Sequence, residues 1–472
     1  MLHIDLVERD DLSGEIYRQT KRAIISNILR PGDALPATRE LARTLSVART
    51  TVVIAYERLE ADGFIQSRQG AGTFVRGSTQ ATNSRSRRIQ LRALAPRPIW
   101  DAIPLPTAFD RSALFDFRTG APDASLFPHR HWRKLISSAL REIEKSANGV
   151  YPSSAGHVGL RQSIARHVGV SRGIAASADD VVITGGTQQA IDLIARVLLS
   201  PDDRIAVEDP CYEAARRAFE AAGARIVGVP VDDDGLIVDA LPADVKAVYV
   251  TPSHQYPLTV TMTLDRRRAL LDWASRNNAA IIEDDYDGEF RFEGRPLEAL
   301  QTLDVAGRVI YVGSFSKTLL PTLRLGFVIL PNSLRSALQR AKYVSDWTTS
   351  TLEQAALSRL IDDGGFVRHL KRARRVYSAR HQRIVDTMAS DFSHHLKLMP
   401  STTGLHVAAM AKLASVDELA AVAARASSLG VEVNQVSSFA VGGAVRPGLM
   451  LGYGAIATEQ IDEGLRRLRS SF

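Results

Sequence analysis

A lysine beside two serines is the most informative group of polar residues in this chain. Ser314, Ser316 and Lys317 follow the apolar run 309–313, which predicts a buried strand, and Arg324 comes seven residues after the lysine. At the end of a buried strand, a lysine amine can condense with the aldehyde of an electron-sink cofactor. Serine hydroxyls and a guanidinium suit a phosphate dianion. The spacing therefore predicts a site for pyridoxal 5'-phosphate, although Lys317 alone would fit an ordinary strand-end lysine.

Carboxylates and a tyrosine follow the next predicted strand upstream. The run 280–284 has the composition of a buried parallel strand, and it ends in Asp284, Asp285, Tyr286 and Asp287. In α/β sheets, ligands bind at the carboxyl ends of the strands. An aspartate that faces the pyridine nitrogen keeps the cofactor ring protonated, and Tyr286 could donate to the ring's phenolic oxygen. The alternative, a solvated acidic turn, stays open for any single one of these carboxylates.

A glycine turn further upstream predicts a phosphate-binding loop. Gly185, Gly186 and Thr187 lie between the predicted strand 181–184 and the predicted helix 191–199. Free backbone N–H groups and the positive end of a helix both favour an anion, and glycine allows it to approach closely. Many strand-to-helix turns carry glycine for conformational reasons alone, so this signal depends on the other two.

In this order along the chain, the three segments resemble fold-type I aminotransferases, over roughly residues 115 to 472. The resemblance implies an α/β fold with a mostly parallel central sheet and a smaller C-terminal subdomain. It also implies a role for each residue in the motifs. These are Lys317 for the Schiff base, Asp284 for the pyridine nitrogen, Tyr286 for the ring oxygen, Tyr212 against the cofactor ring, and Gly186, Thr187, Ser314, Ser316 and Arg324 for the phosphate.

The first quarter of the chain carries a different pattern. Residues 35–42 and 45–59 predict two short helices joined by a tight turn, which is a helix-turn-helix. Val52, Tyr56 and Leu59 recur at helical spacing and should pack inward. The N-terminal end of the second helix is then left to meet base edges and phosphates.

Residues 12 to 76 resemble the winged helix of GntR-type repressors, since a helix, a turn, a second helix and a Gly-x-Gly wing follow in register. The wing is predicted from two apolar segments on either side of residues 69–72. The resemblance implies that double-stranded operator DNA is contacted by Arg39, Arg49, Thr50 and Thr51, with Gln69 and Gly70 at the wing.

The distribution of charge favours the same division. Residues 1–77 contain 11 Lys and Arg against 10 Asp and Glu, and residues 78–114 contain 6 against 2, so together they carry +5 of the chain's net charge of +7. A few placed arginines, rather than a basic tail, must then attract DNA. We predict a DNA-binding domain over 1–77, a flexible basic linker over 78–114 and an effector domain over 115–472. The linker arginines are either a solvated tether or further DNA contacts.

Composition excludes several other classes of protein. No apolar run reaches about 18 residues and no charged-then-apolar leader is visible, so we expect no membrane segment and a cytoplasmic location. Cys211 is the single cysteine, which excludes an internal disulfide framework. We expect it to be a packing residue. The 11 histidines show no metal-ligand spacing, so no metal site is expected.

A winged helix followed by a basic linker and an aminotransferase-like domain is identified as the arrangement of MocR-type regulators within the GntR family. The resemblance implies a sensor of pyridoxal 5'-phosphate or of a small amine, which acts on transcription as a head-to-tail homodimer and catalyses little or nothing. The alternative is a catalytically active aminotransferase with a fused DNA-binding domain.

The chain departs from the aminotransferase pattern at a position that concerns the effector. Aminotransferases usually carry an arginine in a late Arg-Leu-Gly-Phe-like strand, where it binds the carboxylate of the amino acid, and the matching residue here is Met450. Arg446 lies four residues earlier, which a continuous strand would place roughly 13 Å away. We therefore expect the effector to be the cofactor itself, or an amine whose acidic group reaches another arginine. The candidates in sequence are Arg161, Arg216 and Arg446.

Overall fold

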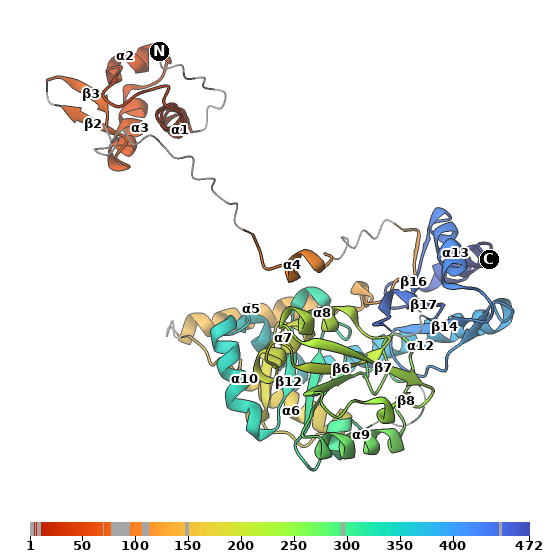
Figure 1. Ribbon diagram of the computed structural model, residues 1–472. Helices are drawn as coiled ribbons and strands as arrows, with labels where there is room; N and C mark the ends of the chain where they lie inside the picture. The colour runs from red at the N-terminus through yellow and green to blue at the C-terminus, as the bar shows by residue number, and fades with distance from the viewer. Residues whose placement is uncertain are drawn as a thin grey trace. The chain divides into compact units, whose positions relative to one another are not determined.

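The computed structural model describes residues 4, 6, 11–68, 70–76, 95–105, 113–146, 151–292, 294, 298–442 and 446–472. The chain divides into two compact units, Met1–Ala95 and Pro96–Phe472 (Figure 1). The finer boundaries expected at residues 77 and 114 stay predictions. Among the described helices, none has both the length and the apolar composition needed to cross a lipid bilayer.

The N-terminal unit has the helices and the wing of a winged helix-turn-helix. Its elements are α1 (Leu12–Ile25), β1 (Ala34–Leu35), α2 (Thr38–Thr44), α3 (Arg49–Ala61), β2 (Ile65–Arg68) and β3 (Gly72–Val75). The central strand β3 pairs antiparallel with both β1 and β2. Val52 and Leu59 are fully buried and Tyr56 is 5% exposed, which confirms the predicted inner face of α3. The apolar spacing of α3 therefore fixes which of its faces is left for a partner.

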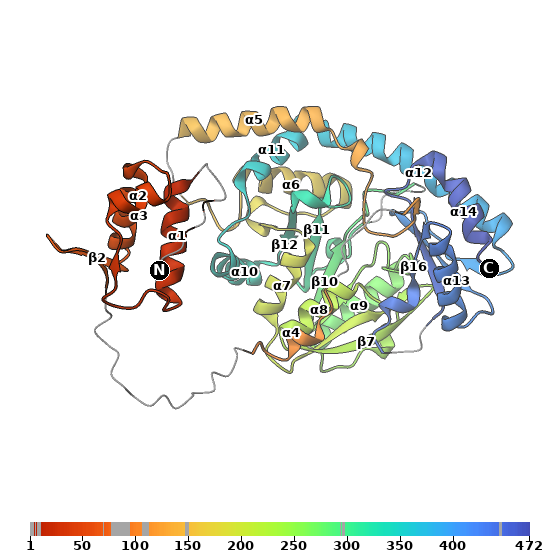
Figure 2. The same ribbon diagram turned by 90° about the horizontal axis from the view of Figure 1, so that it is seen from above.

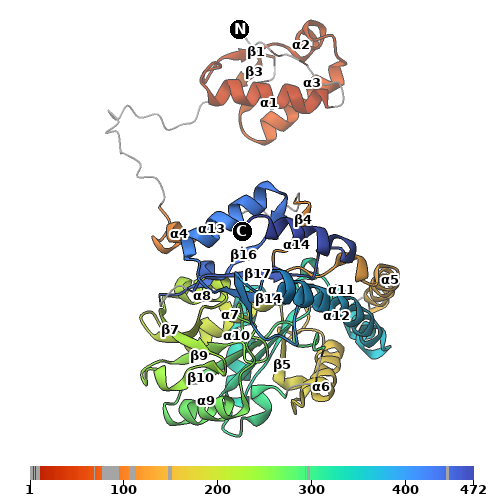
Figure 3. The same cartoon turned by 90° about the vertical axis from the view of Figure 1, so that its right-hand side faces the viewer.

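The C-terminal unit is built around an eight-stranded, mostly parallel sheet, in the order β5-β12-β11-β10-β9-β6-β7-β8. Its strands are β5 (Val181–Thr184), β6 (Arg204–Asp209), β7 (Arg225–Asp232), β8 (Gly235–Leu236), β9 (Ala247–Val250), β10 (Ala280–Asp285), β11 (Val309–Ser314) and β12 (Gly326–Ile329). Strand β12 runs antiparallel between β5 and β11. The central strands are continuous apolar runs because helices cover both faces (Figures 1 and 3).

Helices of this unit enclose the sheet. The helices up to residue 362, together with one short strand, follow in chain order. They are α4 (Ile99–Ala102), β4 (Phe115–Asp116), α5 (His129–Ser146), α6 (Val158–Arg172), α7 (Thr187–Leu198), α8 (Glu213–Ala221), α9 (Leu264–Arg276), α10 (Asn332–Ser345) and α11 (Thr351–Asp362). Cys211 is 1% exposed among the apolar side chains between α7, α8 and the sheet, so the prediction of a packing residue is confirmed.

A smaller antiparallel sheet, in the order β13-β14-β17-β16, forms the expected C-terminal subdomain. Its elements are α12 (Gly365–Asp391), β13 (Leu396–Leu398), β14 (His406–Ala411), α13 (Val416–Ser428), β15 (Val431–Glu432), β16 (Asn434–Gln435), β17 (Gly448–Gly452) and α14 (Ile461–Arg469). Strand β15 pairs with β4. Strand β17 begins at Gly448, so Arg446 lies two residues before it, and the carbonyl oxygen of Pro447 still accepts from the N–H of Ala411 at 2.9 Å.

Candidate functional site

Three strand ends meet at one glycine. Gly326 of β12 pairs with Thr184 of β5 on one side and with Ser314 of β11 on the other. A Cβ atom added to Gly326 would lie 2.9 Å from the Cα of Gly186. Only glycine allows this approach, so Gly326 brings the predicted glycine turn beside the predicted serine segment. Sequence reasoning missed this residue, because the antiparallel position of β12 is not visible in its composition.

The meeting point has the features of an anion site. Gly186, at φ +89°, precedes Thr187 at the start of α7 and offers no side chain to cap the first N–H groups of the helix. The guanidinium of Arg324 lies 3.2 Å from where a Cβ of Gly186 would be, and it donates to the carbonyl oxygen of Gly185 at 2.8 Å. The hydroxyl oxygen of Ser314 accepts from the backbone N–H of Ser316 at 3.1 Å. Uncapped helix N–H groups beside a guanidinium suit a phosphate.

Asp284, the penultimate residue of β10, is 3% exposed and has one satisfied oxygen. Its Oδ2 accepts from the hydroxyl of Tyr249 at 2.7 Å, whereas Oδ1 has no hydrogen-bond partner among the described residues. Burial raises the pKa of the Asp284 carboxyl to about 7, while the Tyr249 hydroxyl and the Lys317 ammonium lower it. A buried acceptor without a partner is costly, and a protonated pyridine nitrogen would supply the missing donor. The residues present therefore fit pyridoxal 5'-phosphate.

Lys317 lies in the turn after β11, and its side chain is half-buried. Its Nζ donates to the carbonyl oxygen of Gly120 at 2.6 Å, a residue in the left-handed region at φ +102°. The ammonium also lies near enough to Asp284 to lower the pKa of that carboxyl. The structure thus brings the predicted lysine and the predicted aspartate into one site. Gly120 gives no sequence signal, because only its backbone takes part.

Three tyrosine rings contact one another near Asp284. The rings of Tyr212 and Tyr256 are 5.8 Å apart and those of Tyr256 and Tyr286 are 5.9 Å apart, both edge to face. Burial raises the pKa of Tyr212, and Asp284 acts in the same direction, so the two side chains lie close. Together these rings make a wall that suits a planar aromatic ligand.

A histidine and an aspartate fix the hydroxyl of Tyr286. The Nδ1 of His254 lies 3.0 Å from that hydroxyl and 3.0 Å from Oδ2 of Asp287. With His406, these residues place three possible ligand atoms within 4.8 Å of one another, a cluster that the sequence spacing did not reveal. Because Nδ1 of His254 is already occupied by Asp287, we interpret the cluster as support for Tyr286. Burial, followed by the neighbouring His254, lowers the pKa of His406 well below that of an exposed imidazole.

The region expected to receive an effector's acidic group is apolar at β17. Met450 is fully buried in an apolar cluster with Ala408 and Val436. Of the candidate arginines, Arg161 donates to the carbonyl oxygen of Ala178 at 2.8 Å, and Arg216 pairs with Glu220 at 3.0 Å. Both guanidinium groups are thus engaged elsewhere.

The predicted DNA contacts lie at the surface of the N-terminal unit. Arg39 in α2 and Arg49 and Thr50 at the start of α3 are exposed, and Thr51 is half-buried. Gly70, at φ +78°, is exposed in the turn between β2 and β3, and Gln69 lies outside the described residues. Sequence reasoning missed Arg68, an exposed wing residue whose guanidinium stacks on Phe74 at 5.1 Å.

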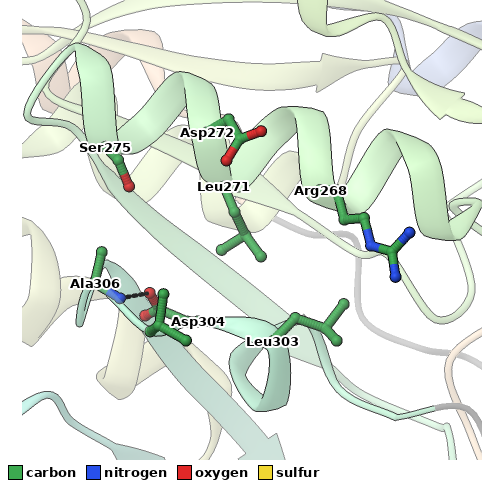
Figure 4. Close-up of a pocket in the computed structure, with 8 residues that line it drawn as sticks. Arg268, Leu271, Asp272, Ser275, Leu303, Asp304 and Ala306 are labelled. Atoms are coloured by element: carbon green, nitrogen blue, oxygen red, sulfur yellow. Dashed lines mark hydrogen bonds between the residues drawn. The ribbon is translucent and has the colours of Figure 1, made fainter.

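A surface pocket elsewhere has no connection with this chemistry. It has a volume of about 280 Å³ and lies between α9 and the short helix Leu300–Leu303 with the residues that follow it (Figure 4). Asp304, which accepts from the N–H of Ala306 at 3.0 Å, and Leu271 are among its lining residues. These residues precede the amino end of β11, whereas Lys317 follows its carboxyl end. Ligands of such sheets bind at the carboxyl ends.

Comparison with known protein families divides the chain as the fold does. Residues 12–75 match the gntR family of bacterial regulatory proteins. The family of aminotransferases class I and II matches residues 115–468.

Individual proteins similar to the chain are of two kinds. The probable rhizopine catabolism regulatory protein MocR of Rhizobium meliloti is 34% identical over 100% of this chain and 96% of its own length. The pyridoxine biosynthesis transcriptional regulator PdxR of Corynebacterium glutamicum is 30% identical over 95% of this chain and 93% of its own. The crystal structure of Pyrococcus horikoshii kynurenine aminotransferase superposes with a TM-score of 0.71 at 30% identity, and covers 76% of this chain and 91% of its own.

Proposed function

Because this chain belongs to the MocR-type transcriptional regulators of the GntR family, we propose that it binds pyridoxal 5'-phosphate in its C-terminal unit and operator DNA through its N-terminal unit. The observation that carries the cofactor proposal is the buried carboxyl of Asp284, which lies near Lys317 and whose Oδ1 has no donor in the part of the chain that the structure describes. When bound, pyridoxal phosphate supplies an electron sink and an aldehyde that captures amines.

Each residue of the site has a separate task in this proposal. Lys317 holds the cofactor covalently, and Asp284 keeps the proton on the ring nitrogen. Tyr286, positioned by His254, donates to the ring oxygen, and Tyr212 lies against the ring. The remaining residues bind the phosphate, namely Gly186, Thr187, Ser314, Ser316 and Arg324.

The N-terminal unit reads the operator. We propose that Arg49 and Thr50 contact base edges in the major groove, with Thr51 beside them at the start of α3. Arg39 contacts the phosphate backbone from α2, and Gln69 and Gly70 approach it from the wing. A head-to-tail homodimer in the cytoplasm would present two such units to two half-sites, as the family resemblance implies.

The effector is the cofactor itself or a small amine that reacts with it. The names of the two regulators point to both possibilities, since one concerns pyridoxine biosynthesis and the other rhizopine catabolism. Binding must favour one DNA-binding state of the chain over another, because a ligand shifts an equilibrium only through its differential affinity. The proposal includes no turnover, since Met450 leaves an amino-acid substrate without its carboxylate partner.

A working aminotransferase is the second candidate function. It is favoured by the complete set of Asp284, Tyr286, Lys317 and Arg324 and by the likeness to the kynurenine aminotransferase. Steady-state turnover above about 1 s⁻¹ with any common amino donor would favour this candidate, because values of that order are ordinary for enzymes.

The experiment that tests the cofactor proposal is chemical mapping. The purified protein, loaded with pyridoxal phosphate, should show the visible absorption of a lysine-bound cofactor, and borohydride reduction followed by peptide mapping should place it on Lys317. The Lys317→Ala variant should lose that absorption while its circular dichroism and oligomeric state stay unchanged. Label on another lysine, or an unchanged spectrum in the variant, would reassign the site.

A further inference from the structure

Helix α5 carries a row of basic side chains along its outer face. Arg130, Arg133, Lys134 and Arg141 are all exposed, at a spacing that places them on one side of the helix. Trp132 and Ala139, on the opposite side, are buried. The four cations and Ser137 line one shallow hollow of about 450 Å³. Within the described part of the chain, none of the four has a carboxylate partner at ion-pair distance.

Helix α12 repeats the spacing. Arg368, Lys371, Arg372 and Arg375 lie at successive intervals of three, one and three residues and are all exposed, and the first acidic residue of the helix is Asp386. Arg368 lies 3.8 Å from Asp363. Lys371 and Arg375 have no carboxylate partner among the residues that the structure describes. Both helices thus present basic side chains to solvent, and the first three of each set share the same spacing.

The two helices meet end to end. The guanidinium of Arg372 donates to the carbonyl oxygen of Leu126, just before α5, and His131 of α5 lies 2.8 Å from Asp363, just before α12. Figure 2 shows α5 and α12 one after the other along a single edge of the C-terminal unit, with α11 beneath α5. Their unpaired cations form what we call the basic band, defined as Arg130, Arg133, Lys134, Arg141, Lys371 and Arg375.

The basic band is unfavourable for the isolated unit. Helix α5 has no acidic residue in its first turn, where a negative charge would offset the helix dipole, whereas the Asp363 carboxylate accepts from the first N–H of α12 at 2.7 Å. Like charges three and four residues apart also repel one another. Helix α5 also carries the exposed Glu142 and Glu144 near its end, but the six like charges of the band disfavour contact with a second copy of the same surface. The arrangement fits a polyanionic partner.

We propose that the basic band binds the phosphodiester backbone of DNA that flanks the operator. The inference rests on the proposed operator binding, since the same chain then holds duplex DNA through its N-terminal unit. The α5 part of the band extends about 16 Å along its axis, which corresponds to roughly five phosphates of one DNA strand. The chain between Val75 and Pro96 can span at most about 70 Å, which leaves flanking duplex within reach. Contacts with phosphates carry no sequence preference, so the band adds affinity without changing which operator is read.

The test compares two lengths of the same operator. The operator would first be selected from random duplexes with the full-length protein, and failure to select any sequence would count against the proposed function itself. Affinity is then measured on the minimal operator and on the same operator lengthened by about two helical turns, roughly 20 base pairs, of arbitrary sequence on each side. The band variant is R133Q/K134Q/R141Q/K371Q/R375Q. The matched control removes the same charge from other exposed positions as K246Q/R268Q/R276Q/R340Q/K412Q.

The wild type and the control should bind the long duplex more tightly than the minimal operator, and the band variant should lose this advantage. The slope of log K against log salt on the long duplex should fall in magnitude by about 2 to 4 per chain, since each lost phosphate contact removes about 0.9. All three proteins should bind the minimal operator alike. The proposal would be overturned if the band variant had the same slope of log K against log salt as the control and the same gain in affinity on the long duplex.

Discussion

At the scale of single residues, the proposed cofactor site contains a buried carboxylate that lacks one of its hydrogen bonds among the described residues. Asp284 is buried, accepts one hydrogen bond from Tyr249 and has a second oxygen with no donor among the described residues. Burial raises the pKa of this carboxyl to about 7 in the cofactor-free protein, whereas an aspartate of the unfolded chain has a pKa near 4. Between these two pH values the folded protein therefore keeps a proton on Asp284 that the unfolded chain has released. The stability linked to that proton is present below about pH 4 and is lost as the pH rises through 7.

Replacement of this carboxyl should therefore stabilise the empty protein at the expense of the cofactor. The Asp284→Asn variant cannot ionise, so without cofactor it should be more stable than the wild type by about 1 to 3 kcal/mol at pH 8 and by less at pH 5. Its affinity for pyridoxal phosphate should fall, because an amide does not hold the ring proton.

Urea unfolding of the cofactor-free proteins at both pH values measures this difference, with Asp233→Asn as the exposed control. A stability difference that is the same at pH 5 and pH 8 would show that Asp284 does not titrate as described.

We expect the reading of the DNA sequence to depend most on Arg49, since this residue begins α3 and is exposed. If its guanidinium makes two hydrogen bonds to a base, Arg49→Ala should weaken operator binding by about 1 to 3 kcal/mol and relax the preference at one base position. The measurement is affinity for the operator and for single-base variants, with Arg30→Ala as the control outside the helix-turn-helix. An equal loss on every sequence would reassign Arg49 to a phosphate contact.

At the scale of elements, we expect β17 to limit which effectors the proposed site accepts. The strand begins at Gly448 and places Met450 in an apolar cluster, while Arg161 and Arg216 are engaged with Ala178 and Glu220. An α-amino acid bound through its amine would thus bring its carboxylate to an apolar surface. An unpaired buried carboxylate costs several kcal/mol.

We therefore expect an amine to bind better than the amino acid that differs from it only by the α-carboxylate. The amine and the amino acid of each pair are titrated separately into the protein loaded with pyridoxal phosphate. Visible absorption gives the affinity for each compound, and operator affinity is measured in parallel. The amine should saturate at a concentration at least about tenfold lower, which is about 1.4 kcal/mol. Tight, saturable binding of an ordinary α-amino acid, coupled to a change in DNA affinity, would contradict this account of β17.

The elements also show what the sequence could and could not predict. Strands β10 and β11 were predictable because buried apolar runs end in polar residues, as at Asp284 and Lys317. The support of Asp284 by Tyr249 was not, since it depends on the parallel pairing of β9 with β10. The same holds for His254 and Asp287, which tertiary structure brings together. The sequence therefore predicts contacts between residues close together in the chain. It does not predict contacts between neighbouring strands, because these depend on strand register.

At the scale of the whole molecule, the order of domains was readable because each half has its own periodicity. Helical spacing and a Gly-x-Gly turn mark the first 76 residues, and strand-end motifs mark the rest. The strand expected to join Arg446 to Met450 is shorter in the structure, where β17 begins at Gly448. Neither periodicity nor motif says how a ligand in one unit alters the other. A change in DNA affinity requires a ligand with unequal affinity for two states of the chain.

The most direct test of the central claim is the operator affinity of the full-length protein, measured by fluorescence anisotropy without cofactor, with pyridoxal phosphate, and with pyridoxal phosphate plus an amine effector. The account predicts that the wild type changes affinity by at least about tenfold, or about 1.4 kcal/mol, between two of these states. It also predicts that Lys317→Ala does not respond. A single operator affinity in all three states, or the same response in Lys317→Ala as in the wild type, would contradict it.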